Sequence, residues 1–120
     1  MSASSIISLP DQPTLHDLQE YVRRMTAERG FDHENVTEKF VLMMEEVGEL
    51  AKAVRKTQGM HLDPNSQKYR TDHEAADVLF YLLDICNKLG IDLEQALRDK
   101  EEMNKKRTWQ APLTENPYSA

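Results

Sequence analysis

The sequence has almost no cysteine and no long apolar run. Cys86 is the only cysteine among 120 residues, so the chain can form neither an internal disulfide nor a metal site built from several cysteines. No stretch approaches the roughly 20 apolar residues of a membrane span, and the first residues lack the basic start and apolar run of a signal peptide. We therefore expect a soluble, cytoplasmic protein that does not bind membranes.

The chain also lacks an excess of basic residues. Its 15 lysines and arginines are outnumbered by 21 acidic residues, which gives a formal net charge of -6. A general grip on a nucleic acid polymer needs a basic surface that neutralises phosphates, so we expect no such partner. An acidic protein that handles a phosphate ester needs a divalent cation to offset the repulsion.

The pattern that is present is helical. A length of 120 residues fits one domain, and its apolar residues recur at helical spacing with no strand-like alternation. Start and stop signals predict four helices, over about residues 14–29, 37–58, 71–90 and 92–106. We predict an all-α, four-helix bundle-like domain over residues 14–107, with an extended arm at 1–13, a loop at 60–70 and a flexible tail at 108–120.

Acidic residues cluster on the second predicted helix. Its apolar stripe, which we expect to face the core, consists of Phe40, Met43, Met44, Val47, Leu50, Ala51 and Val54. Glu45, Glu46 and Glu49 share one surface beside or behind this stripe. A purely solvated face would normally intersperse cations to relieve that repulsion, so this arrangement indicates a missing positive charge.

The third predicted helix also carries clustered acidic residues, in a narrow polar stripe beside a broad apolar arc. The stripe consists of Glu74, Asp77, Tyr81, Asp84 and Lys88. Placing Glu46 and Glu49 against this stripe would confine several carboxylates, which is tolerable only if they are protonated or bind a cation. An all-oxygen ligand set favours Mg²⁺ or Mn²⁺ over Zn²⁺.

An alternative interpretation treats these acids as ordinary surface charges, because glutamate is a strong helix former. Glu74 also fits a capping box with Thr71, in which its side chain would bond back to the start of the helix. Asp77 has no such local explanation.

Two segments resemble the Glu-Glu-x-x-Glu and Glu-x-x-Asp signatures of MazG-type all-α nucleotide pyrophosphohydrolases. They are Glu45-Glu46-Val47-Gly48-Glu49 and Glu74-Ala75-Ala76-Asp77. The resemblance continues through Leu89-Gly90-Ile91-Asp92 to Lys100, Asn104 and Arg107, and so covers about residues 37 to 109. The two motifs in order, with the downstream sequence, are specific, whereas either alone would be weak.

The resemblance implies an enzyme that hydrolyses a nucleoside or deoxynucleoside triphosphate to the monophosphate and pyrophosphate. It implies Mg²⁺, with Mn²⁺ as a substitute, held by Glu46, Glu49, Glu74 and Asp77. The expected catalytic residues are Glu45, Glu46 and Glu49. Glu45 could bind a second metal, orient the attacking water or face solvent.

Substrate contacts are expected from two places. The resemblance makes Lys100, Asn104 and Arg107 phosphate or nucleotide contacts, against the alternative of a solvated, lysine-rich helix end. Tyr81 lines the acidic stripe and could reach the substrate, or simply pack its ring and leave its hydroxyl wet.

Self-association and a house-cleaning role complete the expectation. A chain this short with strongly apolar helices exposes much surface, and MazG-type relatives assemble, so we expect a homodimer or a homotetramer of two dimers. The family includes enzymes that remove noncanonical or excess nucleotides. The alternatives are a related phosphoribosyl-ATP pyrophosphohydrolase or dUTPase, and a non-catalytic helical interaction module.

Overall fold

The computed structural model describes residues 7–59 and 70–107 and contains four helices and no strand in those residues. The helices are α1 (Leu15–Glu28), α2 (Val36–Thr57), α3 (Thr71–Lys88) and α4 (Leu93–Lys105). The predicted all-α fold is confirmed. Parts of the predicted arm and loop (1–6 and 60–69), and the predicted tail (108–120), lie outside the described residues. Among residues 7–59 and 70–107, no helix has the length and apolarity of a membrane span.

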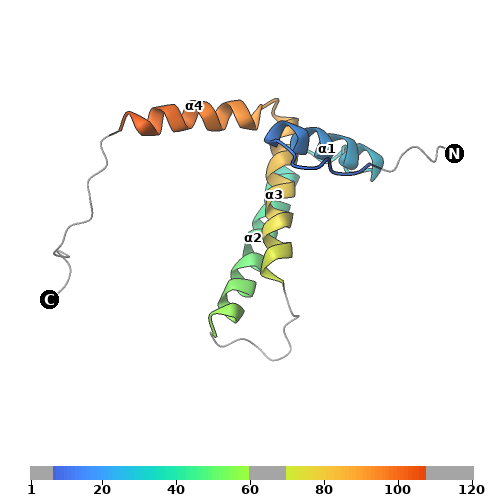
Figure 1. Ribbon diagram of the computed structural model, residues 1–120. Coiled ribbons are helices and arrows are strands. Elements are labelled where there is room, and N and C mark those ends of the chain that lie inside the picture. Colours follow the sequence, from blue (N-terminus) through green and yellow to red (C-terminus); the bar gives the residue numbers. More distant parts are fainter. Residues whose placement is uncertain (1–6, 60–69, 108–120) are drawn as a thin grey trace.

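The centre of the fold is an antiparallel pair of helices, α2 and α3 (Figure 1). α1 lies across the end of α3 where α3 finishes, and it contacts both α3 and α4. α4 leaves from that same end and projects away from the α2–α3 pair (Figure 1). Residues on α4 therefore extend away from the centre of the chain.

Local capping explains where the helices begin. Thr14 and Asp17 form a capping box at the start of α1, with each side chain accepting from the other's backbone N–H at 3.0 Å. Asp92 caps α4, close to its predicted start, by accepting from the backbone N–H of Gln95. α2 starts slightly before the predicted residue, because Asn35 caps it by accepting from the N–H of Glu38.

The predicted capping box at α3 is wrong. The residue at the cap position is Arg70, and no side chain makes a cap hydrogen bond there. The Thr71 hydroxyl is buried without a hydrogen-bond partner among the described residues. Glu74 is therefore not explained by capping.

The hydrophobic core is small and joins α1 to α3. Val22, Met25 and Leu83 form its buried centre. The partly buried side chains of Leu18, Tyr21, Phe80 and Leu93 surround that centre. This core fixes the position of α1 on the helix pair.

The sequence predicts that the apolar stripe of α2 faces the core, but only part of the stripe is covered. Phe40 and Met44 are each 51% exposed, whereas Val47, at the centre of the stripe, is half-buried. The flank of the stripe that faces α3 carries Lys39, which is 2% exposed and pairs with Asp84. The part of the stripe around Phe40 and Met44 is left as an uncovered apolar surface of this chain.

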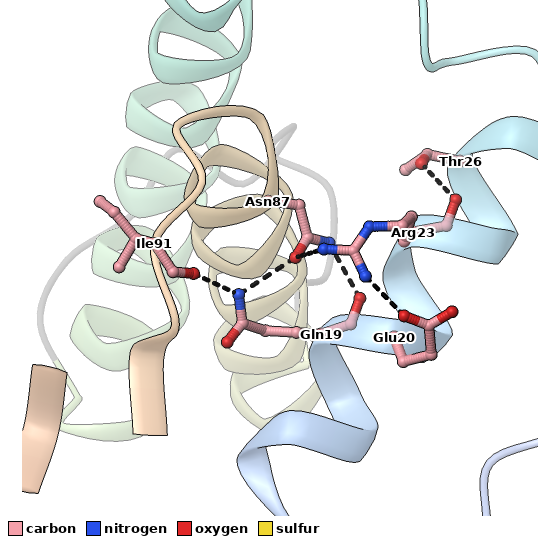
Figure 2. A network of polar contacts seen from close by, with 6 residues as sticks. All are labelled: Gln19, Glu20, Arg23, Thr26, Asn87 and Ile91. Atoms are coloured by element: carbon pink, nitrogen blue, oxygen red, sulfur yellow. Dashed lines mark hydrogen bonds and ion pairs between the residues drawn. The ribbon is translucent and has the colours of Figure 1, made fainter. Parts of the chain in front are cut away.

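A polar network holds α1, the end of α3 and the start of α4 together (Figure 2). The side chain of Gln19 donates to Asn87 Oδ1 (3.0 Å) and to the carbonyl of Ile91 (2.8 Å). It also accepts from the backbone N–H of Leu93 (2.8 Å), so one nearly buried amide joins three segments. Asn87 returns the contact by donating to the carbonyl of Gln19.

Candidate metal centre and adjoining cavity

Three carboxylates from α2 and α3 meet at one point. Glu46, Glu74 and Asp77 each place one oxygen so that the three atoms lie within 4.8 Å of one another. Their positions follow from helical geometry, because Glu74 and Asp77 are three residues apart on one face of α3 and Glu46 faces them from α2. The structure thus brings together three of the four predicted metal ligands.

The electrostatics of this cluster are those of acids that repel one another. Burial raises the pKa of Glu46, and so do a side-chain hydrogen bond with Glu74 and the nearby charges of Asp77, Glu74 and Glu49. Without a cation, the cluster favours a proton on Glu46. A divalent cation would take the place of that proton and satisfy the same oxygens.

Glu49, the fourth predicted ligand, lies outside the group of three but near enough for its charge to act on Glu46. Its Oε2 atom is buried and has no hydrogen-bond partner in residues 7–59 and 70–107. A buried carboxylate oxygen without a partner is costly, and a bound cation or ordered water would remove that cost. The oxygen donors present therefore fit Mg²⁺ or Mn²⁺.

Glu45 has a different environment. It is exposed, and it is not part of the group of close carboxylates. Within one chain, the geometry gives it no ligand role.

A cavity of about 580 Å³ adjoins the cluster. Asp77 lines it and belongs to both sites. Its walls come from α1, the segment between α1 and α2, the start of α2 and the middle of α3. Three rings, those of Phe31, Phe80 and Tyr81, contribute flat apolar surface. The volume is sufficient for a small organic ligand beside the acidic cluster.

Tyr81 is close to both the cavity and the acidic cluster. It lines the cavity, and its pKa is raised by burial first and then by the charge of Glu46. The ring is thus positioned near both the cluster and any ligand in the cavity.

An ion triad, in which two members are buried and one is half-buried, forms part of the polar wall of the cavity, and the sequence did not reveal it. Lys39 Nζ lies 2.8 Å from Glu34 Oε1 and 2.9 Å from Asp84 Oδ2, and all three residues line the cavity. Hydrogen bonds from Lys39 hold the pKa of Glu34 below its usual value. These two carboxylates raise the pKa of Lys39 despite its burial, so the lysine carries its charge.

The predicted substrate contacts on α4 are not near this site within one chain. Lys100 and Arg107 are exposed and Asn104 is half-buried, on or just beyond a helix that projects away from α2 and α3. They could reach an acidic cluster only in another copy of the chain.

Comparison with known proteins adds the family. The MazG nucleotide pyrophosphohydrolase domain matches residues 31–110, which contain both acidic motifs. The chain is 30% identical over 114 residues to human (Homo sapiens) dCTP pyrophosphatase 1, covering 88% of this chain and 65% of the relative. It is 29% identical over 101 residues to the mouse (Mus musculus) protein of that name, covering 80% of this chain and 59% of the relative. The chain thus spans about three fifths of these relatives' length.

Proposed function

The chain belongs to the MazG nucleotide pyrophosphohydrolase family, and we propose that it is a Mg²⁺-dependent nucleoside triphosphate pyrophosphohydrolase. The observation that carries this proposal is the meeting of Glu46, Glu74 and Asp77 oxygens within 4.8 Å beside a cavity of about 580 Å³. The substrate would be a nucleoside or deoxynucleoside triphosphate, with its phosphates at the cluster and its nucleoside in the cavity.

In the proposed reaction, the oxygen of a water molecule bonds to the α-phosphorus. The bond from that phosphorus to the bridging oxygen breaks, and pyrophosphate leaves with a nucleoside monophosphate as the second product. When bound, Mg²⁺ would neutralise triphosphate charge and make the water more acidic.

The acids of this chain then have separate roles. Glu46, Glu74 and Asp77 are the candidate ligands of Mg²⁺, with Mn²⁺ as an alternative ion. Glu49 is either a further ligand or the base that accepts the proton of the attacking water, because its Oε2 is buried and has no partner among the described residues. Glu45 is exposed, so we give it no role within its own chain.

Self-association is part of the proposal. The uncovered part of the apolar stripe of α2, with Phe40 and Met44 each 51% exposed, is a surface suited to a second copy of the chain. A dimer, or a tetramer of two dimers, would also let α4 of one chain bring Lys100, Asn104 and Arg107 to the phosphates bound by another.

The cellular role we propose is removal of noncanonical or excess nucleotides in the cytoplasm. A reducing compartment suits a chain with one cysteine, Cys86, which is buried and unpaired.

The test is pyrophosphate release from a panel of standard and modified nucleoside triphosphates, with Mg²⁺ and with chelator. We expect pyrophosphate release only with the metal. The rate of release should fall by about 100-fold or more in Glu49→Gln. Glu38→Gln is the matched control, because Glu38 lies on the same helix but at its exposed start. Full activity in Glu49→Gln would remove Glu49 from the site, and no turnover of any nucleotide would refute the proposed function.

A further inference from the structure

The ion triad of Glu34, Lys39 and Asp84, with its buried Lys39–Asp84 pair, needs an explanation beyond stability. Lys39 is 2% exposed and Asp84 is 5% exposed, and burying such a pair stabilises a fold little better than apolar side chains of similar volume. Both residues line the cavity next to the acidic cluster, so a ligand in the cavity would meet them.

The pair lies at a fixed distance from the candidate metal centre on both helices. Lys39 precedes Glu46 by seven residues on α2, and Asp84 follows Asp77 by seven residues on α3. Seven residues of helix rise about 10.5 Å. This is comparable with the distance from the α-phosphate of an extended nucleotide to the far edge of its base. Phosphates at the cluster would therefore place the base near the pair.

The pair has hydrogen-bonding groups that its own contacts do not use. An ammonium group has three N–H donors, and Glu34 and Asp84 lie at 2.8 Å and 2.9 Å from that of Lys39. The Phe31 ring, whose centroid is 5.5 Å away, faces the same ammonium. Two carboxylates thus occupy two of the three N–H donors, and lone pairs on both acids remain to accept from a ligand. Of the two acids, Asp84 is on the same helix as Asp77 and lines the cavity with it, whereas Glu34 lies in the segment before α2. Asp84 is therefore the acceptor considered for a base.

We propose, on the basis of the function proposed above, that Asp84, held in place by Lys39, selects nucleotides whose base carries an exocyclic amino group. Cytosine, adenine and guanine donate from such a group to a carboxylate. Uracil and thymine have a carbonyl oxygen in place of the amino group of cytosine, hypoxanthine has one in place of the amino group of adenine, and a carboxylate repels that oxygen. Phe80 and Tyr81 supply flat surfaces for the base.

The experiment compares kcat/KM within two pairs of substrates that differ by an amino group in one and a carbonyl oxygen in the other, dCTP with dUTP and dATP with dITP. We expect the wild type to favour the amino member of each pair by about 10- to 100-fold, the effect of one hydrogen bond to a charged group. Asp84→Asn, whose amide can donate to a carbonyl, should bring both ratios close to one. Asp72→Asn, an exposed acid on the same helix, is the control and should keep the wild-type ratios.

A second variant separates base selection from a structural role. Lys39→Met combined with Asp84→Leu replaces the pair by apolar side chains of similar volume, which should keep the protein folded. We expect this variant to hydrolyse both members of each pair with equal kcat/KM. Wild-type ratios in this variant, or an Asp84→Asn enzyme slowed equally on all substrates, would overturn base selection by Asp84.

The outcomes also distinguish the two proposals. Equal kcat/KM for both members of each pair in the wild type refutes the inference and leaves the pyrophosphohydrolase intact. Release of pyrophosphate from no nucleotide refutes the proposed function and the inference with it.

Discussion

Replacing Glu46 by glutamine should make the metal-free protein more stable while weakening the stabilisation that Mg²⁺ gives. Glu46 shares its position with Glu74 and Asp77, whose oxygens lie within 4.8 Å. Two unit charges at 4.8 Å repel by about 0.9 kcal/mol in water and about 3.5 kcal/mol at an effective dielectric constant near 20. Because Glu46 is only half-buried and solvent screens the repulsion, we expect a gain near the lower end, about 1 to 2 kcal/mol.

The assay is thermal unfolding with chelator and then with Mg²⁺. For a domain of this size, 1 kcal/mol shifts Tm by roughly 3 to 6 °C, so metal-free Glu46→Gln should melt at least about 3 °C above the wild type. Mg²⁺ should raise the Tm of the wild type and should raise that of the variant much less, because one ligand has been lost.

Glu45→Gln is the matched control for Tm, since Glu45 is the neighbouring acid but is exposed and outside the cluster. Its metal-free stability should change by less than about 0.5 kcal/mol. A Glu46→Gln protein that is no more stable than the wild type without metal, and that responds to Mg²⁺ as the wild type does, would refute the cluster as a cation site.

Four further perturbations test other parts of the structure. Folding raises the pKa of Glu46 above its usual value of 4.5. The stability that protonated Glu46 contributes is therefore complete below pH 4.5 and is lost as the pH rises through its pKa in the folded protein. The Tm of the metal-free wild type should fall more steeply above pH 4.5 than that of Glu46→Gln. Gln19→Ala removes the buried amide that bonds three segments and should lower the free energy of unfolding in urea by about 2 to 4 kcal/mol. Leu83→Ala opens a cavity at a side chain that is 1% exposed and should reduce the same quantity by about 2 to 4 kcal/mol. Met44→Glu places a charge on the uncovered part of the stripe and should shift the protein toward the monomer in light scattering, whereas an unchanged mass would exclude that surface as an interface.

The elements that sequence predicted well are those set by neighbouring residues. The starts of α1 and α4 depend on cap bonds within three residues, Thr14 with Asp17 and Asp92 with Gln95, which the sequence displays directly. Gly59 and Gly90 adopt a positive φ just after α2 and α3, a conformation that glycine allows and that commonly ends a helix. The i, i+3 spacing of Glu74 and Asp77 likewise fixed a shared face.

The parts that it missed depend on contacts between elements. Periodicity located the apolar stripe of α2, but could not tell whether its partner belongs to the same chain, and part of the stripe is uncovered in this chain. Lys39 occupies the buried side of α2 only because Glu34 from the preceding segment and Asp84 from α3 both reach it. A lysine is normally expected at the surface, so no local pattern marked this one. The direction of α4 depends on the hydrogen bond that the backbone N–H of Leu93 donates to the side chain of Gln19. Gln19 is on α1, far from Leu93 in the sequence.

The most direct test of the account is the product pattern when the purified wild-type protein is given dCTP, followed by ³¹P NMR with Mg²⁺ and then with excess chelator. The account predicts dCMP and pyrophosphate in equal amounts with Mg²⁺, no orthophosphate, and no reaction after chelation. Orthophosphate as the product, or turnover that survives removal of the metal, would contradict a Mg²⁺-dependent pyrophosphohydrolase centred on Glu46, Glu74 and Asp77.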